Sequence, residues 1–488
     1  MEAPRRRFFN CRPMLPGMVG ALAGAIVAVK LGNPSLWLLG LWGVALGAFA
    51  LVRRWEWFAL PLFFGLLLLR GALTPTVEVP AGTYPISGTV INRPAKRQLS
   101  TTAVLYPVYI SGTRVPGALQ LSVPAAARPA YGETLFCTVT LEEDPTVHCQ
   151  GPFVVMYAGR ARGGIWTNPS RGEGFYGWSL AARERLEGVA QALFYPWDGP
   201  AKGILLGDKS DVDFLTYEAY RRSGLLHLLT VSGLHVGVAG AVILALIRGR
   251  RRWLRMALAW TLVALFCLLT GLAPSALRAA VMLLCFHLGL QLRRQDDGLS
   301  QLGCALILLL LLEPRYLLCN GFCLSFGCIY GLVCLSRPLS RLLPGGGQRR
   351  GSLLAGAFSV FFATAPLLSR VGGDLSWVGI PLSLLAIPLA PFLLVPGWAA
   401  MLLYPLLPQV ARAVALVPRG VLLLLQSVAT LAPWEGLSVP YCGDLPLILW
   451  YAGILLVSDL FLPNARRPAY LGWSVLFVAL VLWMTALV

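Results

Sequence analysis

The sequence has little charge of either sign. Only 13% of its 488 residues are Asp, Glu, Lys or Arg, whereas 57% are apolar, and the mean hydropathy is +0.69. Soluble globular domains carry about 25% charged residues, so this composition excludes a soluble globular chain. A cleaved secretory signal does not explain the first apolar stretch, because a second and a third follow after a few polar residues. The sequence therefore predicts a polytopic α-helical membrane protein whose N-terminus is retained.

Patterns that bind metals or nucleotides are also scarce. The chain has four histidines and 11 cysteines, and none of them stand at the C-x-x-C or Cys/His spacings of a zinc site. The sequence nearest to a phosphate-binding loop is Gly-Ile-Leu-Leu-Gly-Asp-Lys-Ser at 203–210. It has one residue too few between its glycines, and an aspartate where the Walker A motif has lysine. We expect no metal, no cofactor and no nucleotide-driven motor in this chain.

Apolar runs recur along the chain at roughly the 17 to 25 residues needed to cross a bilayer, and they predict about thirteen transmembrane helices. The net charge of +18 is carried mainly by arginine, since there are only four lysines. If the N-terminus is cytoplasmic, the cytoplasmic connections hold +17 of this charge. The positive-inside rule therefore explains the basicity and places 74–228 and the C-terminus outside. The predicted spans are 14–30, 35–52, 57–73, 229–247, 256–271, 275–291, 300–312, 317–335, 351–369, 377–404, 415–432, 445–461 and 470–488.

One long polar stretch, 74–228, interrupts the apolar runs. Its first half reads as short strands separated by turn sequences such as Ser-Gly-Thr and Val-Pro-Gly. The strands are expected at 84–91, 103–111, 118–123, 133–141 and 153–157. Five short strands in about 75 residues suit a small Greek-key barrel of the OB-fold type. The predicted domains are N-terminal helices at 1–73, an exterior OB-like β domain at 74–162, an amphipathic linker with further helices at 163–228, and a multi-helix transmembrane domain at 229–488.

The predicted barrel has two open interpretations. OB barrels bind single-stranded nucleic acid through aromatic platforms beside a basic groove. Against this role, residues 74–162 carry a net charge of only +2, which is a weak electrostatic footprint. A structural cap over a pore is the alternative. The side chains available for strand contacts are Tyr106, Tyr109, Tyr131, Arg93, Lys96, Arg97 and Arg114.

Cysteines are informative in the exterior stretch, where oxidation is permitted. Cys137 and Cys149 fall there, and strands joined by a short connection bring such residues within bridging distance. Cys137 and Cys149 are a candidate disulfide pair, and two free thiols are the equal alternative. Cys319, Cys323 and Cys328 lie along one apolar run and are predicted to be small core residues.

Residues 175–194 have the pattern of an amphipathic helix. Apolar residues recur at helical spacing from Trp178 to Leu193, while Arg183 and Glu187 face elsewhere. The apolar face is expected to lie either on the outer leaflet of the membrane or against the barrel. In the later span 377–404, Pro381, Pro388, Pro391 and Pro396 predict a broken helix that lines a cavity.

Polar residues stand inside or beside apolar segments between 221 and 290. Such groups cost several kcal/mol in lipid unless they are paired or solvated, so they mark a site or a water-filled path. Arg278 either snorkels to the exterior interface or faces an aqueous conduit and attracts an anion. Ser232 and His235 share a helical face, as a nucleophile and its base require, but a Ser-Gly step also bends or closely packs a membrane helix. The candidate path residues are Arg221, Arg222, His227, Ser232, Gly233, His235 and Arg278.

Several motifs follow one another in order. They are Gly207-Asp208, the run Gly-Leu-Leu-His-Leu-Leu-Thr-Val-Ser-Gly-Leu-His-Val at 224–236, Gly271 with Pro-Ser-Ala-Leu-Arg-Ala at 274–279, Arg294 with Asp297, and Glu313-Pro314 with Gly-Phe-Cys-Leu-Ser-Phe at 321–326. Together they resemble the competence domain of the ComEC/Rec2 family. The resemblance covers nearly the whole chain: N-terminal helices, an exterior OB-like domain and a multi-helix core.

The resemblance implies a channel in the bacterial cytoplasmic (inner) membrane that passes one strand of captured DNA into the cytoplasm during natural transformation. It implies that the chain contacts single-stranded DNA and membrane lipid. It also implies a separate DNA-capture protein, a nuclease and a cytoplasmic translocation ATPase as partners, and it is compatible with a homo-oligomer.

Many members of that family continue into a metallo-β-lactamase-like domain thought to degrade the other strand, whereas this sequence stops at Val488. Such a binuclear hydrolase needs a His-x-His-x-Asp-His cluster, which His148, His227, His235 and His287 do not form. We therefore expect no enzymatic activity. Two further functions stay open: transport of another anionic solute or polymer, and a membrane-embedded hydrolase that uses Ser232 and His235.

Overall fold

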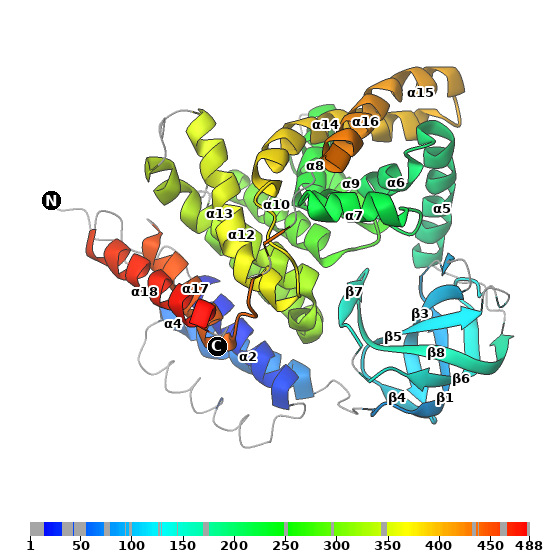
Figure 1. Cartoon of the computed structure of the whole chain (residues 1–488), viewed down its shortest axis with the longest axis horizontal. Coiled ribbons are helices and arrows are strands. Elements are labelled where there is room, and N and C mark those ends of the chain that lie inside the picture. Colours follow the sequence, from blue (N-terminus) through cyan, green and yellow to red (C-terminus); the bar gives the residue numbers. More distant parts are fainter. Residues whose placement is uncertain are drawn as a thin grey trace.

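A computed structural model shows a mostly helical molecule with one β-barrel at its edge (Figure 1). The predicted span 35–52 lies outside the described residues apart from Trp42. The structure describes residues 14–31, 42, 55–72, 79–92, 94–96, 100–124, 127, 129–143, 145–168, 175–247, 252–293, 297–342, 349–431, 436–437, 439–458 and 466–485.

The N-terminal and C-terminal helices pack together at the end of the molecule away from the barrel (Figure 1). Leu15 near the start of the chain shares one buried cluster with Trp450 and Trp483 near its end. The helices are α2 (Met14–Leu31), α4 (Trp55–Ala72), α5 (Phe175–Phe194), α6 (Asp198–Leu206), α7 (Phe214–Arg222), η2 (Leu226–Leu229), α8 (Gly233–Leu246), α9 (Arg252–Leu269), α10 (Pro274–Gln291), α11 (Gly298–Leu312), η3 (Pro314–Leu318), α12 (Asn320–Leu342), α13 (Arg349–Arg370), α14 (Gly379–Leu403), α15 (Pro408–Val414), α16 (Leu416–Leu431), α17 (Asp444–Val457) and α18 (Arg466–Met484).

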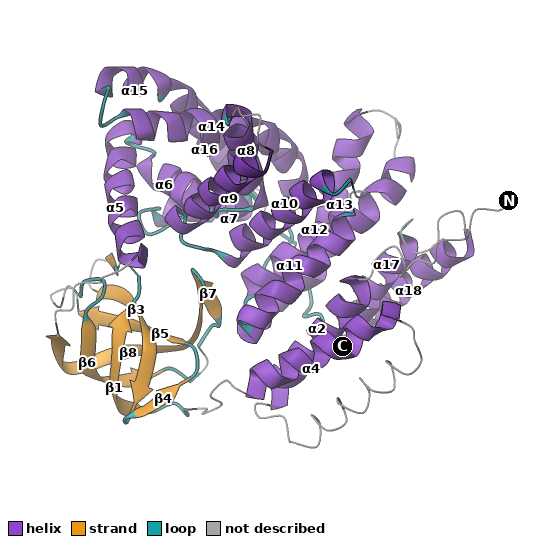
Figure 2. Cartoon of the chain, turned by 180° about the vertical axis from the view of Figure 1, so that it is seen from behind, coloured by secondary structure: helices purple, strands orange, loops and turns teal. Residues whose placement is uncertain are grey.

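Five strands close a barrel, which lies at the lower left of Figure 2, beneath α5. Around the ring the order is β1, β3, β5, β8, β6 and back to β1; β5 and β8 are parallel and the other pairs antiparallel. Alternating apolar residues fill the interior, including Leu105, Leu119 and Leu135, none of which is exposed. The strands are β1 (Thr83–Val90), β2 (Ala95–Lys96), β3 (Ser100–Ile110), β4 (Thr113–Val115), β5 (Ala118–Pro124), β6 (Thr134–Leu141), β7 (His148–Gln150) and β8 (Phe153–Asn168).

All five predicted strands form, and four of them lie within three residues of their expected bounds. The fifth was predicted to end at residue 157, but β8 continues to Asn168. The extension exists because β8 has two partners: its first part pairs with β5, and its later part pairs with β6. Sequence signals such as the Gly163-Gly164 pair suggest a turn there, and pairing with β6 overrides them.

Five helical stretches among the described residues are long and apolar enough to cross a membrane. Seven shorter apolar helices accompany them, so the predicted count of about thirteen spans stays a prediction. The five stretches are Pro274–Gln291, Asn320–Leu342, Ser352–Arg370, Gly379–Leu403 and Pro408–Leu431.

Helix α5 packs on other helices. Its residues Ala190, Leu193 and Phe194 are fully buried in a cluster with residues of α6, α14 and α16. Neither expectation for its apolar face, the outer leaflet or the barrel, describes this contact. The sequence showed that an apolar face exists, but its partners on α14 and α16 lie some two hundred residues further along the chain.

Helix α14 is continuous from Gly379 to Leu403, so the prediction of a broken helix is wrong. Pro388, Pro391 and Pro396 lie inside it. Prolines are tolerated in membrane helices because neighbouring helices and local adjustments satisfy the freed backbone groups. Irregular backbone occurs instead between α7 and α8, where the segment around η2 lines the site described next.

Candidate functional site

A cavity of about 2150 Å³ lies between the barrel and the helices. Its lining includes Asn92 and His148 from the barrel, the segment around η2, the first turns of α8 and α10, and residues of α12, α13 and α14. Small-molecule sites usually measure about 300–1,000 Å³. This cavity is larger, and it has room for a segment of a polymer.

Six of the seven candidate path residues line this cavity: Arg221, Arg222, His227, Ser232, Gly233 and Arg278. The seventh, His235, is buried behind them with 2% of its surface exposed. The fold therefore brings together residues that are up to 57 positions apart, as the motif order suggested.

Ser232 and His235 form a helix cap. Ser232 precedes α8, and its backbone N–H donates to Nδ1 of His235 at 3.1 Å. The Ser232 hydroxyl lies 3.0 Å from the same nitrogen. This is the capping-box arrangement with histidine in place of the usual Glu or Gln. Nδ1 accepts the backbone N–H of Ser232, and no ion pair joins His235 to a carboxylate among the described residues, so the geometry of this pair is that of a helix cap.

Arg278 lies in the second turn of α10 and is 4% exposed. Within the described part of the chain, its Nε atom has no hydrogen-bond partner and no carboxylate forms an ion pair with it. Its guanidinium carbon stands 5.8 Å from the ring centre of Phe326. Arg278 therefore does not snorkel to an outer surface, and its side chain is buried in the wall of the cavity.

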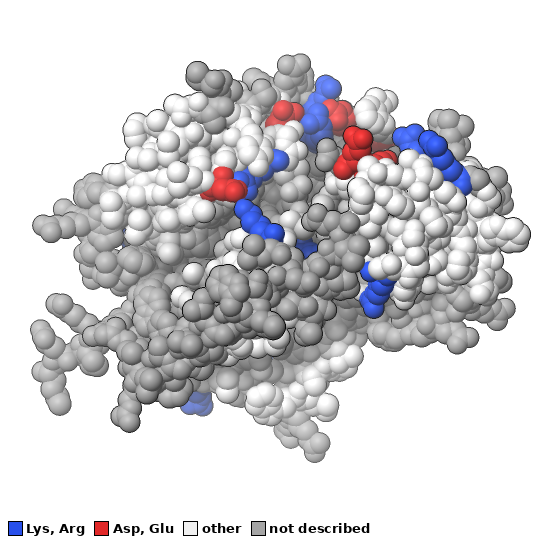
Figure 3. Space-filling model, turned by 90° about the horizontal axis from the view of Figure 1, so that it is seen from below, with Lys and Arg blue, Asp and Glu red and all other residues white. Residues whose placement is uncertain are grey.

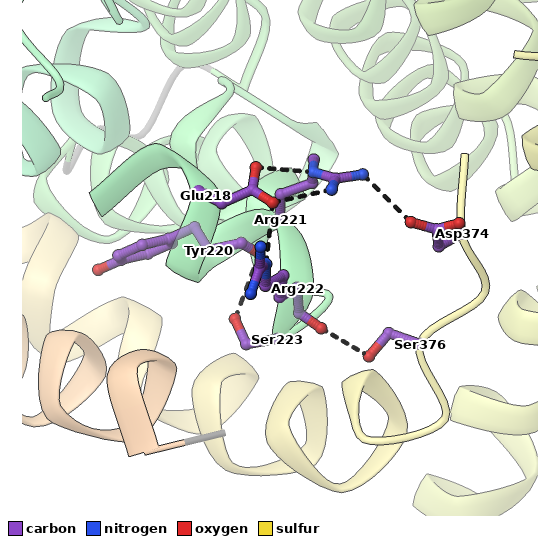
Figure 4. Close-up of polar contacts among 7 residues, drawn as sticks. All are labelled: Glu218, Tyr220, Arg221, Arg222, Ser223, Asp374 and Ser376. Atoms are coloured by element: carbon purple, nitrogen blue, oxygen red, sulfur yellow. Dashed lines mark hydrogen bonds and ion pairs between the residues drawn. The ribbon is translucent and has the colours of Figure 1, made fainter. Parts of the chain in front are cut away.

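Arg221 and Arg222 are engaged in ion pairs at the edge of the cavity (Figure 4). Both nitrogens of the Arg221 fork bond to Glu218, at 2.8 and 2.9 Å, and its third nitrogen lies 3.3 Å from Asp374 in the loop before α14. Arg222 also donates to Glu218, at 2.9 Å. Both arginines, which the sequence offered as candidate path residues, are thus paired with nearby carboxylates.

The two arginines hold the pKa of Glu218 to about 2, because their side chains donate hydrogen bonds to the carboxylate. A lowered carboxyl pKa means that the ion pairs are complete above its ordinary range and are lost only as the pH falls toward 2. Glu218 therefore stays ionised across physiological pH. Ser376, in the same loop as Asp374, donates a further hydrogen bond to the backbone oxygen of Arg222 at 2.9 Å.

Acidic and basic residues balance along the described cavity lining, which has five of each. Figure 3 shows the same mixing on one face of the molecule, where red and blue side chains lie next to one another. Net charge therefore does not define the site, and the unpaired cations do. Lys209 is a second such cation among the described lining residues, and burial lowers its pKa. In the sequence, Lys209 lies in the stretch 203–210, which does not match a Walker A loop. Gly207, two residues earlier and the first residue of the family motifs, was the available signal.

The barrel is attached to the helices through the β7 hairpin, which points toward them in both Figure 1 and Figure 2. The hydroxyl of Tyr316 donates to the backbone oxygen of Pro152 at 2.8 Å, and Val154 packs in one cluster with Tyr316 and Phe322. Burial raises the pKa of Tyr316 to about 12, so this hydroxyl stays protonated and able to donate at physiological pH.

A disulfide between Cys149 of β7 and Cys319 before α12 completes the attachment. The predicted Cys137–Cys149 pair is therefore wrong, and so is the assignment of Cys319 as a core thiol. Cys137 is a buried free thiol in β6. Its side chain points into the barrel, whereas Cys149 lies on the hairpin that reaches across to the helices.

Thiol counting tests this pairing directly. Denatured wild-type protein, blocked with maleimide before reduction, is expected to gain two reactive thiols after reduction. Cys149→Ser and Cys319→Ser should each abolish this gain, whereas Cys137→Ser should keep it. Mass spectrometry of the labelled chains gives the count, and a gain that is lost in Cys137→Ser and Cys149→Ser but kept in Cys319→Ser would restore the original expectation.

Three of the candidate residues for strand contacts, Tyr106, Tyr109 and Arg114, lie close together on the barrel. Arg114 lies opposite Tyr109 across the β3–β4 pair and donates to the Tyr106 hydroxyl at 3.4 Å, while Tyr106 packs on Phe153. Tyr131 lies before β6, in the loop that follows β5. Arg93 and Arg97 fall outside the described residues, and Lys96 is described only as part of β2. No group of three or more His, Cys, Asp or Glu residues in the described part of the chain is arranged to hold a metal.

These features define a class: a helical membrane protein with a closed five-stranded barrel docked on its helices and a large cavity between them. A family profile described as "Competence protein" matches residues 204–462, just over half of the chain, and this range contains α8, α10 and Arg278. The chain belongs to the competence protein family, and its resemblance to ComEC/Rec2 proteins is confirmed.

Curated relatives agree with this assignment. The chain is 29% identical over 236 residues to ComE operon protein 3 of Bacillus subtilis (strain 168), a match to 48% of this chain and 30% of the relative. It is 30% identical over 218 residues to competence protein ComA of Neisseria gonorrhoeae, covering 40% and 31% of the two chains. It is 27% identical over 222 residues to the uncharacterized protein YcaI of Escherichia coli (strain K12), covering 41% and 28%. The matches thus span less than a third of each relative. No solved structure matches the chain significantly.

Proposed function

We propose that this protein is the channel through which single-stranded DNA crosses the bacterial cytoplasmic membrane during natural transformation. The observation that carries the proposal is the large cavity between barrel and helices with the unpaired Arg278 inside it. Membership of the competence family supports the same function. A strand moved without regard to sequence needs contacts to its phosphates and not to its base edges, and an unpaired buried arginine is such a contact.

The barrel has a supporting role in this proposal. Its ring order, with one parallel pair closing an otherwise antiparallel barrel, fits an OB-like module. Tyr109 is 39% exposed beside Arg114, an aromatic surface next to a cation of the kind that holds single strands. We propose that this surface guides the strand toward the cavity.

The orientation follows the charge distribution. We propose that the N-terminus is cytoplasmic and that the barrel and the C-terminus are exterior, in keeping with the arginine-rich connections. Surface capture, degradation of the second strand and the driving force are assigned to a separate DNA-capture protein, a nuclease and a cytoplasmic ATPase. The chain itself is proposed to act without catalysis, in contact with lipid, either alone or as a homo-oligomer.

Glu218→Gln tests the electrostatics of the cavity mouth. The variant removes the carboxylate that pairs with Arg221 and Arg222, so both gain capacity for phosphate while Arg221 keeps its contact with Asp374. Binding of an oligothymidylate to the purified protein should tighten several-fold, and the log–log salt slope should steepen by about one. Glu143→Gln on the exposed barrel surface makes the same charge change and should alter neither quantity. A slope unchanged in Glu218→Gln would contradict a path for phosphates at this mouth.

A deletion strain tests the function itself. We expect labelled DNA to bind the cell surface normally, while DNase-protected DNA in the cytoplasm and the number of transformants fall to background. The wild-type gene should restore both. Normal cytoplasmic arrival in the deletion strain would refute the proposal.

A further inference from the structure

The surroundings of Arg278 favour the binding of an anion. Its side chain is almost fully buried, its Nε is without a partner among the described residues, and the nearest described aromatic ring offers only a weak contact. A buried guanidinium is stable when it is both paired and hydrogen-bonded. Arg278 lines the cavity, so an anion in the cavity can reach it.

The guanidinium also lies at the first turn of α8. A Cβ atom added to Gly233 would stand 3.3 Å from its terminal nitrogen, so the absence of a side chain at this position lets the two approach. The backbone N–H groups of Gly233 and Leu234 are in the first turn of α8 and have no acceptor among the described residues. Both residues line the cavity.

This arrangement places two positive features side by side. The N-terminus of a helix carries a partial positive charge, and a cation beside it is electrostatically unfavourable. An anion between the guanidinium and the helix start reverses both effects, because each group then donates hydrogen bonds to it. Two contacts hold the parts in place: Ser275 at the start of α10 donates to the backbone oxygen of Val231 at 2.9 Å, and His235 fixes the residue before α8.

We propose that Arg278 and the backbone N–H groups of Gly233 and Leu234 form a seat for one phosphate group, here called the phosphate seat. A forked guanidinium and the first-turn amides of a helix suit the tetrahedral oxygens of a phosphate. On the proposed function, on which this step rests, the occupant is one phosphodiester of the passing strand. The seat holds each phosphate in turn and so sets the position of the strand in the cavity.

Binding to the purified full-length protein in nanodiscs tests the phosphate seat. The probes are inorganic phosphate, fluorescent oligothymidylate, and an oligothymidylate of the same length with an uncharged methylphosphonate backbone. The variants are Arg278→Met, Arg278→Lys and Gly233→Ala; the control is Arg255→Met, an exposed arginine of α9 that does not line the cavity. Inorganic phosphate is expected to raise the unfolding temperature of the wild type and the control, but not that of Arg278→Met.

The second measurement is the affinity of each variant for the oligonucleotides and its dependence on salt. Arg278→Met should bind the charged strand about tenfold more weakly, with a salt slope reduced by about one, and the methylphosphonate strand should not distinguish the variants. Arg278→Lys should fall between, because it keeps the charge and loses the fork. Gly233→Ala should also weaken binding, because its methyl group occupies the space beside the guanidinium. Equal phosphate stabilisation and equal salt slopes in Arg278→Met and wild type would overturn the seat.

The cell assay separates this inference from the function on which it rests. If Arg278→Met loses phosphate binding in the purified protein and cells that carry it still take up DNA normally, the seat stands and the path of the strand lies elsewhere. If inorganic phosphate stabilises the protein while neither oligonucleotide competes with it, the seat serves a free phosphate ion and its assignment to DNA is overturned.

Discussion

Replacing Arg278 with glutamine is expected to lower the amount of DNase-protected DNA that reaches the cytoplasm by about tenfold or more, with surface capture unchanged. A charged hydrogen-bond partner contributes about 1.5–3 kcal/mol, and each 1.4 kcal/mol is a factor of about ten in affinity. Arg278 is the only arginine among the described residues of the cavity lining that forms no ion pair. Uptake of labelled DNA into cells, scored separately for the surface and the cytoplasm, measures the effect.

Arg278→Lys separates the effect of the positive charge from the effect of the guanidinium shape. Arg278→Lys should retain part of the transport because it keeps the positive charge, and Arg255→Gln on exposed α9 should behave as wild type. Protein levels in the membrane must be equal in all strains. Full transport by Arg278→Gln would show that the buried charge has no part in moving the strand.

Gly224→Ala is expected to have the second large effect, on stability as well as transport. Gly224 has a φ of +73°, and an added Cβ would stand 2.8 Å from the Cα of Gly379 at the start of α14. The backbone conformation disfavours a side chain by about 1–2 kcal/mol, and overpacking adds about 1–3 kcal/mol. The substitution should therefore separate the segment around η2 from α14 and disturb the cavity wall that both form.

Gly372→Ala provides the matched control for this close approach. Its φ is +67°, nearly the same, but nothing lies within 4 Å of an added Cβ. Gly372→Ala should therefore lower the stability only by the part that comes from the backbone conformation. Thermal unfolding in detergent compares the two variants, and equal unfolding temperatures would mean that the contact between Gly224 and Gly379 does not matter.

Local patterns predicted much of the fold. The barrel strands appeared in the sequence because period-two alternation and turn residues act over a few positions, and Leu105, Leu119 and Leu135 all point inward as that pattern requires. The cluster of path residues was also predictable, since the segments before α8 and α10 carry polar residues in apolar surroundings.

Contacts between distant segments were not predictable in the same way. Cys149 and Cys319 are separated by 170 positions, and Arg221 meets Asp374 across 153. The Glu218 partner of both arginines stands three and four residues before them on α7, so half of that cluster was visible as helical spacing. The prolines of α14 misled the prediction because the packing around a membrane helix, which the sequence does not reveal, decides whether it breaks.

The central claim is that the DNA strand passes through the cavity, and site-specific crosslinking in transforming cells tests it most directly. A photoreactive amino acid is placed at Ser325 of α12 or Val360 of α13, both in the cavity lining, and at Leu342, which is 68% exposed at the end of α12 and outside it. The account predicts that labelled incoming DNA crosslinks to the protein at Ser325 and Val360 and not at Leu342. Uptake at the wild-type rate without crosslinking at either cavity position would contradict it.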